Sequence, residues 1–172
     1  MAWVRSEYAG ELSVVSAWLA ALLPWNLTYS TIAEGEVTIL SARFPFVQLR
    51  YLLGIELPGQ ENPAIDHPFA ARGAVEGMPL LVYDLWIAGA AFVLVAVALS
   101  IAMYLDEARI EDALPTSPVR VMGGLLGAAT LLLSASTLAI VTRGEFGGGI
   151  PVPIGLLVLG VLSWVLLTVD LT

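Results

Sequence analysis

The sequence predicts an all-α membrane protein with four transmembrane helices and a structured, partly β loop outside the membrane between helices 1 and 2. Of its 172 residues, 58% are hydrophobic and 13% are charged, whereas an ordinary soluble domain is about 45–50% apolar and about 25% charged. Four stretches are apolar over about the 20 residues that a helix needs to cross a bilayer. The chain has no cysteine, which excludes a disulfide-stapled secreted domain. We therefore expect a single membrane domain over residues 1–172.

The four predicted helices cover residues 12–29, 80–105, 121–141 and 150–169. The fourth is the clearest, because no charge interrupts it between Glu145 and Asp170. Its Pro151 and Pro153 stand in the first turn, where a missing N–H group costs little. The third helix is rich in Gly, Ala, Ser and Thr, and the second is longer than a span needs, so it can tilt.

The first hydrophobic segment is the weakest of the four, because Pro24 lies inside it. Two acidic residues, Glu7 and Glu11, stand where a signal peptide carries positive charge, and bulky Pro24-Trp25-Asn26 replaces the small residues of a cleavage site. We therefore expect a retained helix rather than a cleaved signal.

About fifty residues, 30–79, separate the first two helices, and a loop of this length is usually functional. Along it, the sequence pattern predicts a strand at 36–43, either a helix at 46–53 or a strand at 46–51, a Pro-rich linker at 57–68, and a short helix at 69–76. This segment is too small to hold a core alone, so we expect a cap on the membrane surface.

The two remaining links are short. The charged link at 106–120 extends the second helix until Pro115 and Pro118 stop it, and the Gly-rich turn at 143–149 makes the last two helices an antiparallel hairpin. The arginines divide almost evenly between the two sides, so the positive-inside rule favours both termini in the cytoplasm only slightly. The expected location is the plasma membrane, with several passes.

Asp84 is the one carboxylate inside an apolar stretch. It is either an interfacial or structurally paired acid, or an ion or proton site, and Arg143 is its candidate partner on the same membrane face. The spacing Gly123-x-x-x-Gly127 lets another helix approach closely, either within this chain or from a second copy.

The long loop holds the most function-like surface patch that the sequence predicts. Its members are aromatic and basic: Arg43, Phe44, Phe46, Arg50 and Tyr51. Such a set could bind a partner protein or an anionic headgroup, or simply anchor the chain at the interface, where arginine snorkels and aromatic rings lie at headgroup depth.

No residue is predicted to be catalytic, to bind a cofactor or to bind a metal. His67 is the sole histidine, and beside a single Asp66 it lacks the further ligands of a metal site. The net charge of −8 excludes the basic footprint of a nucleic-acid binder. Seven arginines with no lysine fit either a GC-rich genome or life in high salt, where exposed carboxylates keep a surface hydrated and salt screens their repulsion.

Several motifs resemble a family of small uncharacterised haloarchaeal membrane proteins. They are Trp-Val-Arg-Ser-Glu-Tyr-Ala-Gly-Glu-Leu at residues 3–12, Leu-Pro-Trp at 23–25, Arg-Phe-Pro-Phe at 43–46, and the run from Val-Thr-Arg-Gly to Ile-Pro-Val-Pro at 141–153. The resemblance covers nearly the whole chain and implies an archaeal plasma membrane and high salt. It implies no activity and no site residue.

The expected function is non-enzymatic: a membrane scaffold or accessory subunit that packs against a protein partner or forms a homo-oligomer, with membrane lipid around it and no cofactor. The alternative is a small transporter or channel subunit that uses Asp84. A third hypothesis is a membrane enzyme that acts at headgroup level through the long loop. A pore needs several polar groups along it, and the predicted spans hold few besides Asp84 and scattered serines and threonines.

Overall fold

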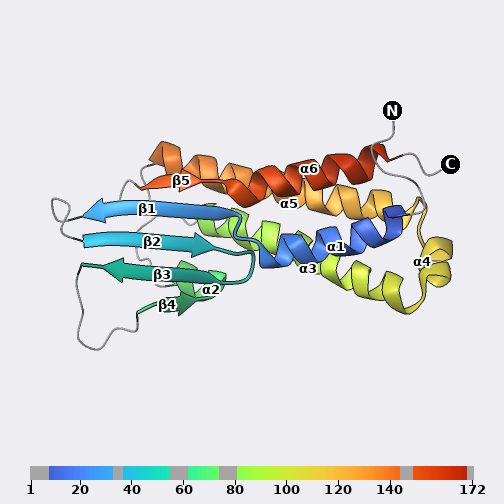
Figure 1. The fold of residues 1–172 in the computed structure, drawn as a ribbon, viewed down its shortest axis with the longest axis horizontal. Helices are drawn as coiled ribbons and strands as arrows, with labels where there is room; N and C mark the ends of the chain where they lie inside the picture. Colours follow the sequence, from blue (N-terminus) through green and yellow to red (C-terminus); the bar gives the residue numbers. More distant parts are fainter. Residues whose placement is uncertain (1–7, 33–36, 55–61, 74–80, 144–148, 170–172) are drawn as a thin grey trace.

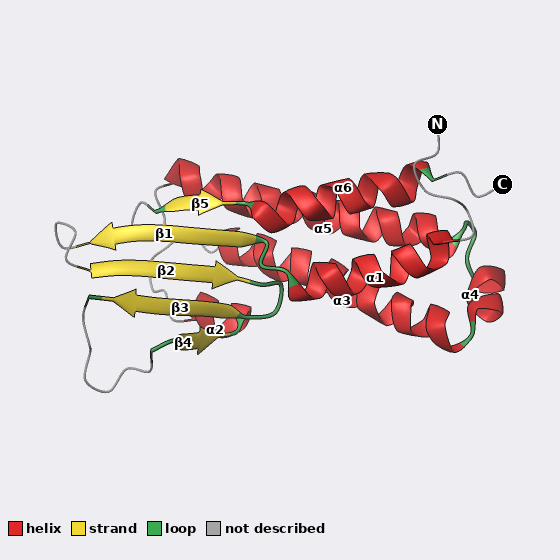
Figure 2. Ribbon diagram, viewed as in Figure 1, coloured by secondary structure: helices red, strands yellow, loops and turns green. Residues whose placement is uncertain are grey.

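The computed structural model describes residues 8–32, 37–54, 62–73, 81–143 and 149–169, and over these residues the protein has five strands and six helices (Figure 1; Figure 2). The elements are α1 (Ala9–Leu22), β1 (Asn26–Ile32), β2 (Val37–Arg43), β3 (Gln48–Leu53), β4 (Ala64–Asp66), α2 (Pro68–Gly73), α3 (Leu81–Leu105), α4 (Glu107–Ala113), α5 (Pro118–Arg143), β5 (Ile150–Val152) and α6 (Ile154–Thr168). The strands form one antiparallel sheet in the order β4-β3-β2-β1-β5. The fold is mixed α/β, so the prediction of an all-α protein with four transmembrane helices is wrong.

The first error lies at Pro24. A proline disfavours helical backbone in the residue before it, and Leu23 is extended, with φ −85° and ψ 138°. The helix predicted at 12–29 therefore ends at Leu22, and the polar–apolar alternation of the next residues continues as β1. β1 lies between β2 and β5 in the sheet.

The second error lies at the last predicted helix. Its first residues, Ile150–Val152, form β5 and pair with β1, and α6 has only 15 residues. A helix of 15 residues is about 22 Å long, which is less than the roughly 30 Å of a bilayer's hydrocarbon core. In the part of the chain that is described, two helices are long and apolar enough to span a membrane, at Leu81–Leu105 and Pro118–Thr142.

The long loop contributes most of the sheet. β2 lies where the sequence predicts a strand. Of the two alternatives predicted for the next segment, a helix at 46–53 or a strand at 46–51, the structure has the strand, as β3. The strand forms because the turn after β2, closed by a hydrogen bond from Phe44 N to Val47 O at 2.8 Å, folds β3 back along it. β4 falls inside the predicted linker, and α2 begins the predicted short helix, whose last residues, 74–76, lie outside the described residues.

The helices and the sheet occupy opposite ends of an elongated molecule (Figure 1). Helices α1, α3, α5 and α6 run side by side, and the sheet continues beyond the end of α1, in front of the neighbouring ends of α2 and α3 (Figure 2). One apolar core joins α1, α3, α5 and α6, and a second core, which includes Trp25 and Trp86, lies nearer the sheet. The start of α1 and the end of α6 lie at the α4 end.

Candidate functional site

The helices bury several serines beside their apolar core and leave many large apolar side chains exposed. Five serines are at most 5% exposed: Ser13, Ser16, Ser100, Ser136 and Ser163. In contrast, Leu131 is 73% exposed and Leu157 is 70% exposed. The exposed apolar belt consists of Val15, Trp18, Leu19, Leu22, Phe92, Leu94, Val95, Ile101, Leu131, Leu138, Val141, Leu157, Val161, Trp164 and Leu167. A helix that is apolar on all sides is typical of the core of a large protein or of a membrane span.

Two of the buried serines join neighbouring helices. Ser136 Oγ on α5 donates a hydrogen bond to Val82 O on α3 at 3.0 Å. Ser163 Oγ on α6 donates one to Gly123 O on α5 at 2.8 Å. Such bonds between helices hold a bundle together where no water is available to the polar groups.

The sheet is also polar on the side that faces the helices. Successive side chains of a strand point to opposite faces, and the buried ones are polar on all three long strands. They are Asn26, Thr28 and Ser30 on β1, Ser41 and Arg43 on β2, and Gln48 on β3. The interior between sheet and helices is therefore a buried polar layer, made of these six side chains.

Arg43 is the charged centre of this buried polar layer, with 1% of its surface exposed. Its Nη1 donates a hydrogen bond to Thr28 Oγ1 at 2.6 Å, and Thr28 Oγ1 in turn donates to Asn26 Oδ1 at 3.0 Å. Asn26 Nδ2 then donates to Thr137 Oγ1 on α5 at 3.3 Å. A chain of hydrogen bonds thus runs from β2 through β1 to α5 and fixes the sheet on the helices.

Burial lowers the pKa of the Arg43 guanidinium from its ordinary value to about 10. The nearby Tyr83 raises this pKa, and the positive charge of Arg50 lowers it further. A pKa of about 10 leaves Arg43 protonated at neutral pH, so the layer holds a positive charge. Gln48, which is also buried, has a side-chain oxygen without a hydrogen-bond partner among the described residues.

A second connection between sheet and helices runs through the turn after β2. Trp86 Nε1 on α3 donates to Phe44 O and to Pro45 O, both at 3.0 Å, and Trp25 Nε1 donates to Phe44 O at 3.3 Å. The two indole rings lie 6.0 Å apart. α6 touches the same region, because Gly155 lies directly against the backbone of Pro24 and Trp25.

The patch predicted from residues 43–51 does not gather on one surface. Arg43 is buried, Phe44 is half-buried, and Phe46 is exposed at the turn. Arg50 and Tyr51 are neighbours on β3, so their side chains leave opposite faces of the sheet. Successive side chains of a strand point to opposite faces, so residues that are close in sequence and similar in chemistry lie on different sides of the sheet.

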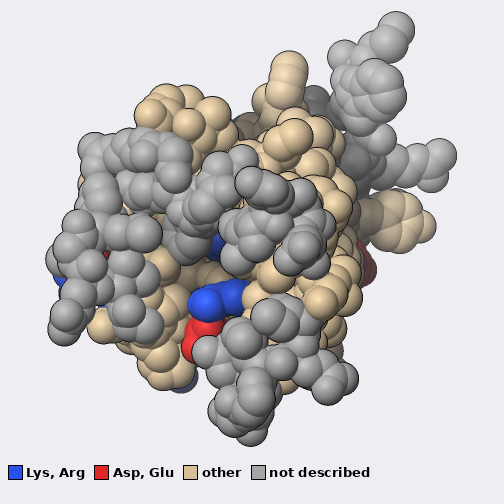
Figure 3. Space-filling model, turned by 90° about the vertical axis from the view of Figure 1, so that its left-hand side faces the viewer, with Lys and Arg blue, Asp and Glu red and all other residues tan. Residues whose placement is uncertain are grey.

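Asp84 lies in the first turn of α3, and its side chain is 51% exposed. Its Oδ1 accepts a hydrogen bond from Arg72 Nε of α2 at 2.8 Å. The side chain of Arg143, its predicted partner, lies outside the described residues. Figure 3 views the sheet end of the molecule and shows basic and acidic atoms in contact on a surface that is otherwise largely uncharged where it is described.

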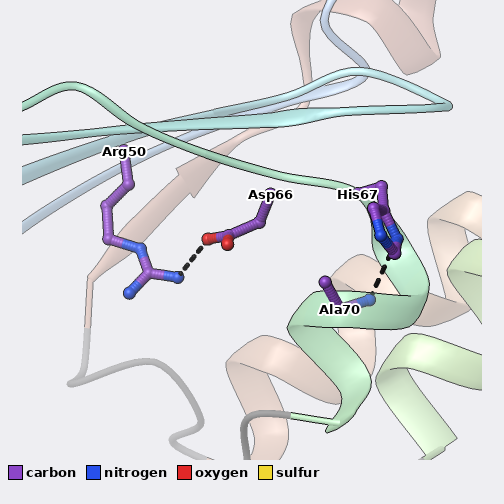
Figure 4. Close-up of polar contacts among 4 residues, drawn as sticks. All are labelled: Arg50, Asp66, His67 and Ala70. Atoms are coloured by element: carbon purple, nitrogen blue, oxygen red, sulfur yellow. Dashed lines mark hydrogen bonds and ion pairs between the residues drawn. The ribbon is translucent and has the colours of Figure 1, made fainter. Parts of the chain in front are cut away.

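A second ion pair, which is half-buried, joins two strands and leads into α2 (Figure 4). Arg50 of β3 and Asp66 of β4 lie 3.0 Å apart, and the adjacent His67 accepts a hydrogen bond at Nδ1 from Ala70 N at 3.0 Å. His67 therefore caps the short helix α2. Among the described residues, no group of three or more His, Asp or Glu is placed to hold a metal ion.

The predicted small-residue motif on α5 packs inside the chain. A Cβ atom added at Gly123 would lie 3.0–3.1 Å from atoms of Leu166 and Leu167, and one added at Gly127 would lie 2.8 Å from Ser163 Oγ. Both glycines therefore permit the close approach of α6. Gly124, between them, has no atom within 4 Å of its added Cβ.

Two hollows open on the sides of the helices. A cavity of about 260 Å³ lies between the turn after β2, the start of α2 and α3, where Phe46, Phe69 and Leu94 are among its lining residues. A shallower groove of about 590 Å³ lies between α5 and α6 and ends beside Trp164. Both are lined mainly by apolar side chains.

The buried polar layer is not among the features predicted from the sequence. The signal was available in Asn-Leu-Thr-Tyr-Ser-Thr-Ile at Asn26–Ile32, where polar residues alternate with mostly larger apolar ones. This alternation has the period of a strand, whereas the prediction of one apolar helix over residues 12–29 covers its first four residues.

A protein-family model matches residues 2–171, which is nearly the whole chain, and it is described as a family of unknown function, DUF7549. None of the curated proteins matches the chain.

Proposed function

The chain belongs to the DUF7549 family, whose function is unknown, and we propose from its architecture that it is an integral membrane protein anchored through α3 and α5. In this proposal it serves as a non-enzymatic scaffold or accessory subunit that packs against a protein partner. The location proposed is the plasma membrane, with membrane lipid around the helices.

The observation that carries the proposal is that the helices leave many large apolar side chains exposed while they bury serines in their core. In water, serines would face outward and leucines inward, because burying an apolar side chain is worth about 1.5–3 kcal/mol. Here Ser136 is fully buried while Leu131, five residues earlier on the same helix, is 73% exposed. The exposed apolar belt includes side chains of α1, α3, α5 and α6, whereas soluble monomers rarely expose contiguous apolar patches larger than a few hundred Å², so lipid is the environment that it fits.

The distances along the helices support the same proposal. Asp84 stands near the start of α3 and Asp106 follows its end, so the charges are 22 residues and about 33 Å apart. That distance matches the hydrocarbon thickness of a bilayer. Arg120 and the acidic α4 lie at the second boundary, while the Arg72–Asp84 pair lies at the first.

We further propose that the α4 end, where α1 starts and α6 ends, is cytoplasmic, and that the sheet lies on the other side. The composition, with seven Arg, no Lys and a net charge of −8, supports a haloarchaeal membrane at high salt as the setting. Maleimide labelling of single cysteines in intact cells, one at Leu53 on the sheet and one at Ala113 on α4, tests the orientation. Labelling of Ala113→Cys alone from outside would reverse it.

The membrane proposal is tested by tryptophan fluorescence in vesicles that contain brominated lipid chains, which quench tryptophans in contact with them. Trp164 and Trp18 are exposed in the apolar belt, whereas Trp25 and Trp86 are buried. We expect strong quenching of the native protein and loss of most of it in the double variant Trp18→Phe/Trp164→Phe. The single variant Trp25→Phe, as the matched control, should keep it.

Release of the native protein from membranes by alkaline carbonate, or equal quenching of the native protein and the double variant, would refute the proposal. A transporter that uses Asp84 has less support, because this carboxylate pairs with Arg72 on an exposed surface. Ion flux in vesicles that is lost in Asp84→Asn would overturn our choice between the two functions.

A further inference from the structure

The outer face of the sheet, on the side away from the helices, is largely apolar, and its residues are exposed or half-exposed. Row by row across the strands, this outer sheet face consists of Ile150, Tyr29, Leu40 and Tyr51 in one row, Val152, Leu27, Ala42, Leu49 and Ile65 in the next, and Thr31, Thr38 and Leu53 at its end. Ile150 is 73% exposed, Ile65 63% and Tyr29 54%. In Figure 1 no labelled helix lies in front of the sheet.

This arrangement is the reverse of an ordinary half-exposed sheet, whose apolar face packs on the core and whose polar face meets water. Here the polar face is buried against the helices, and the face left open is apolar. An uncovered apolar surface of this kind marks an interaction site. We infer that the outer sheet face binds the same face of a second copy of this chain, which makes the protein a membrane homodimer through sheet-on-sheet packing.

The area of the outer sheet face is sufficient for this contact. Strands about 4.8 Å apart with about 3.3 Å per residue give β1, β2, β3 and the two short edge strands a projected area of about 400 Å². Protruding side chains have more accessible surface than their projection, so two such faces would bury on the order of 1,000 Å², the lower limit for a specific interface.

The chemistry of the face also favours a second copy. The described residues of this face carry no charge, since Arg43, Arg50 and Asp66 point to the opposite side of the sheet. A twofold contact places each patch against the same patch of the second copy, so an uncharged patch meets itself without electrostatic repulsion. A charged partner would find no opposite charge on this face. At the edge, Pro151 leaves β5 without one N–H donor, which disfavours pairing of another strand there.

The inference rests on the proposed function, because two copies inserted in one membrane have the same orientation. A twofold axis along the membrane normal then brings the two outer sheet faces together. Leu40 lies on β2, the central strand, and is therefore close to that axis.

The test uses the absence of native cysteines. Two full-length variants, Leu40→Cys on the outer sheet face and Val161→Cys on the apolar belt of α6, are reconstituted in vesicles and treated with a bifunctional maleimide that spans about 10 Å, the separation of packed sheets. We expect at least tenfold more cross-linked dimer from Leu40→Cys than from Val161→Cys. Equal cross-linking of the two variants would overturn the inference.

Spin labels at the same two cysteines identify what covers each surface. A dimer predicts that the Leu40 label is shielded from both oxygen and a water-soluble nickel complex, while the Val161 label, in lipid, is accessible to oxygen alone. Access of oxygen alone to the Leu40 label would show that lipid covers the sheet, and access of nickel would show that water does; either result overturns the dimer. The Val161 label reports the membrane placement separately, so the two proposals can fail independently.

A charge variant gives a measurement that does not depend on labels. Leu40→Asp puts two like charges together near the axis, whereas Leu105→Asp adds a charge beside Asp106 at the other end of the molecule. In light scattering of the detergent-solubilised protein, we expect the dissociation constant to rise at least tenfold for Leu40→Asp and to stay unchanged for Leu105→Asp, with equal melting temperatures. A native protein that is monomeric at tens of micromolar would refute the dimer.

Discussion

Gly155, in the first turn of α6, is the position where a single added methyl group should disturb the junction between helices and sheet most. Its added Cβ would lie 2.7 Å from Trp25 Cα and 2.8 Å from Pro24 C, and would overlap Pro24 O. These are backbone atoms of the link between α1 and β1, so they cannot rotate away as the end of a side chain could. We predict that Gly155→Ala destabilises the protein.

Two opposing effects set how much Gly155→Ala lowers the free energy of unfolding. Alanine is favoured over glycine in a helix interior by about 1 kcal/mol. Overpacking of a tight interior costs about 1–3 kcal/mol, and the cost belongs at the upper end here because the contacts are backbone. The expected net loss is about 2 kcal/mol of unfolding free energy, which corresponds to a melting temperature about 4–8 °C lower for a chain of this size.

The matched control is Gly160→Ala on the same helix. Its added Cβ would meet Thr130 Cγ2 at 3.7 Å, an ordinary van der Waals distance. Thermal unfolding of both variants in the same detergent should therefore give a lower melting temperature for Gly155→Ala and an unchanged or higher one for Gly160→Ala. Equal melting temperatures would show that α6 does not pack against the α1–β1 link as described.

Four further predictions concern polar groups and salt. Thr28→Val removes the hydroxyl that accepts from the buried guanidinium, and we expect a loss of about 2–3 kcal/mol in denaturant unfolding; Thr142→Val, which changes an exposed hydroxyl, should cost less than about 0.5 kcal/mol. Ser163→Ala should lower the free energy of denaturant unfolding by about 1 kcal/mol, because it removes a hydrogen bond between helices; a loss no greater than that of Ser134→Ala, which changes an exposed serine, would contradict this role. Asp84→Asn should lower stability by less than about 1 kcal/mol, because the ion pair that it breaks is exposed; a larger loss in thermal unfolding would show a structural role. Raising KCl from about 0.1 M to about 1 M shortens the Debye length from about 10 Å to about 3 Å, so the melting temperature should rise, and a fall would contradict the high-salt proposal.

The sequence predicted helices where apolar residues run without interruption, and α3 and α5 lie in two of those runs. It did not predict β1 or β5, because a strand of seven or three residues beside an apolar helix adds to the same hydrophobic run. The alternation within β1 is a local strand signal, whereas β5 has only three residues, too few for a period to be recognised. What decides them is pairing: Leu27 and Tyr29 lie opposite Val152 and Ile150, more than 120 residues later in the chain.

The surroundings of the candidate functional residues could not be predicted from the neighbouring sequence either. Arg43, with its neighbours Phe44 and Phe46, suggests an exposed patch when the sequence is considered alone, and Asp84 suggests a partner among the arginines at the ends of the helices. The register of β2 and β3 places Arg43 inside, and the position of α2 beside α3 gives Asp84 the side chain of Arg72. Both outcomes depend on elements that are distant in sequence.

The sequence by itself determined the composition of the chain, its four apolar segments and the near absence of charge within them, because these properties are sums over local residues. The tertiary structure decided which of these segments contain strands, that five helix serines are buried while leucines such as Leu131 and Leu157 are exposed, and that the sheet buries its polar side. The physical reason is that a side chain's environment is set by what packs against it. Only the folded chain shows that Arg43 lies in the interior and that the apolar face through Leu40 has no cover among the described residues.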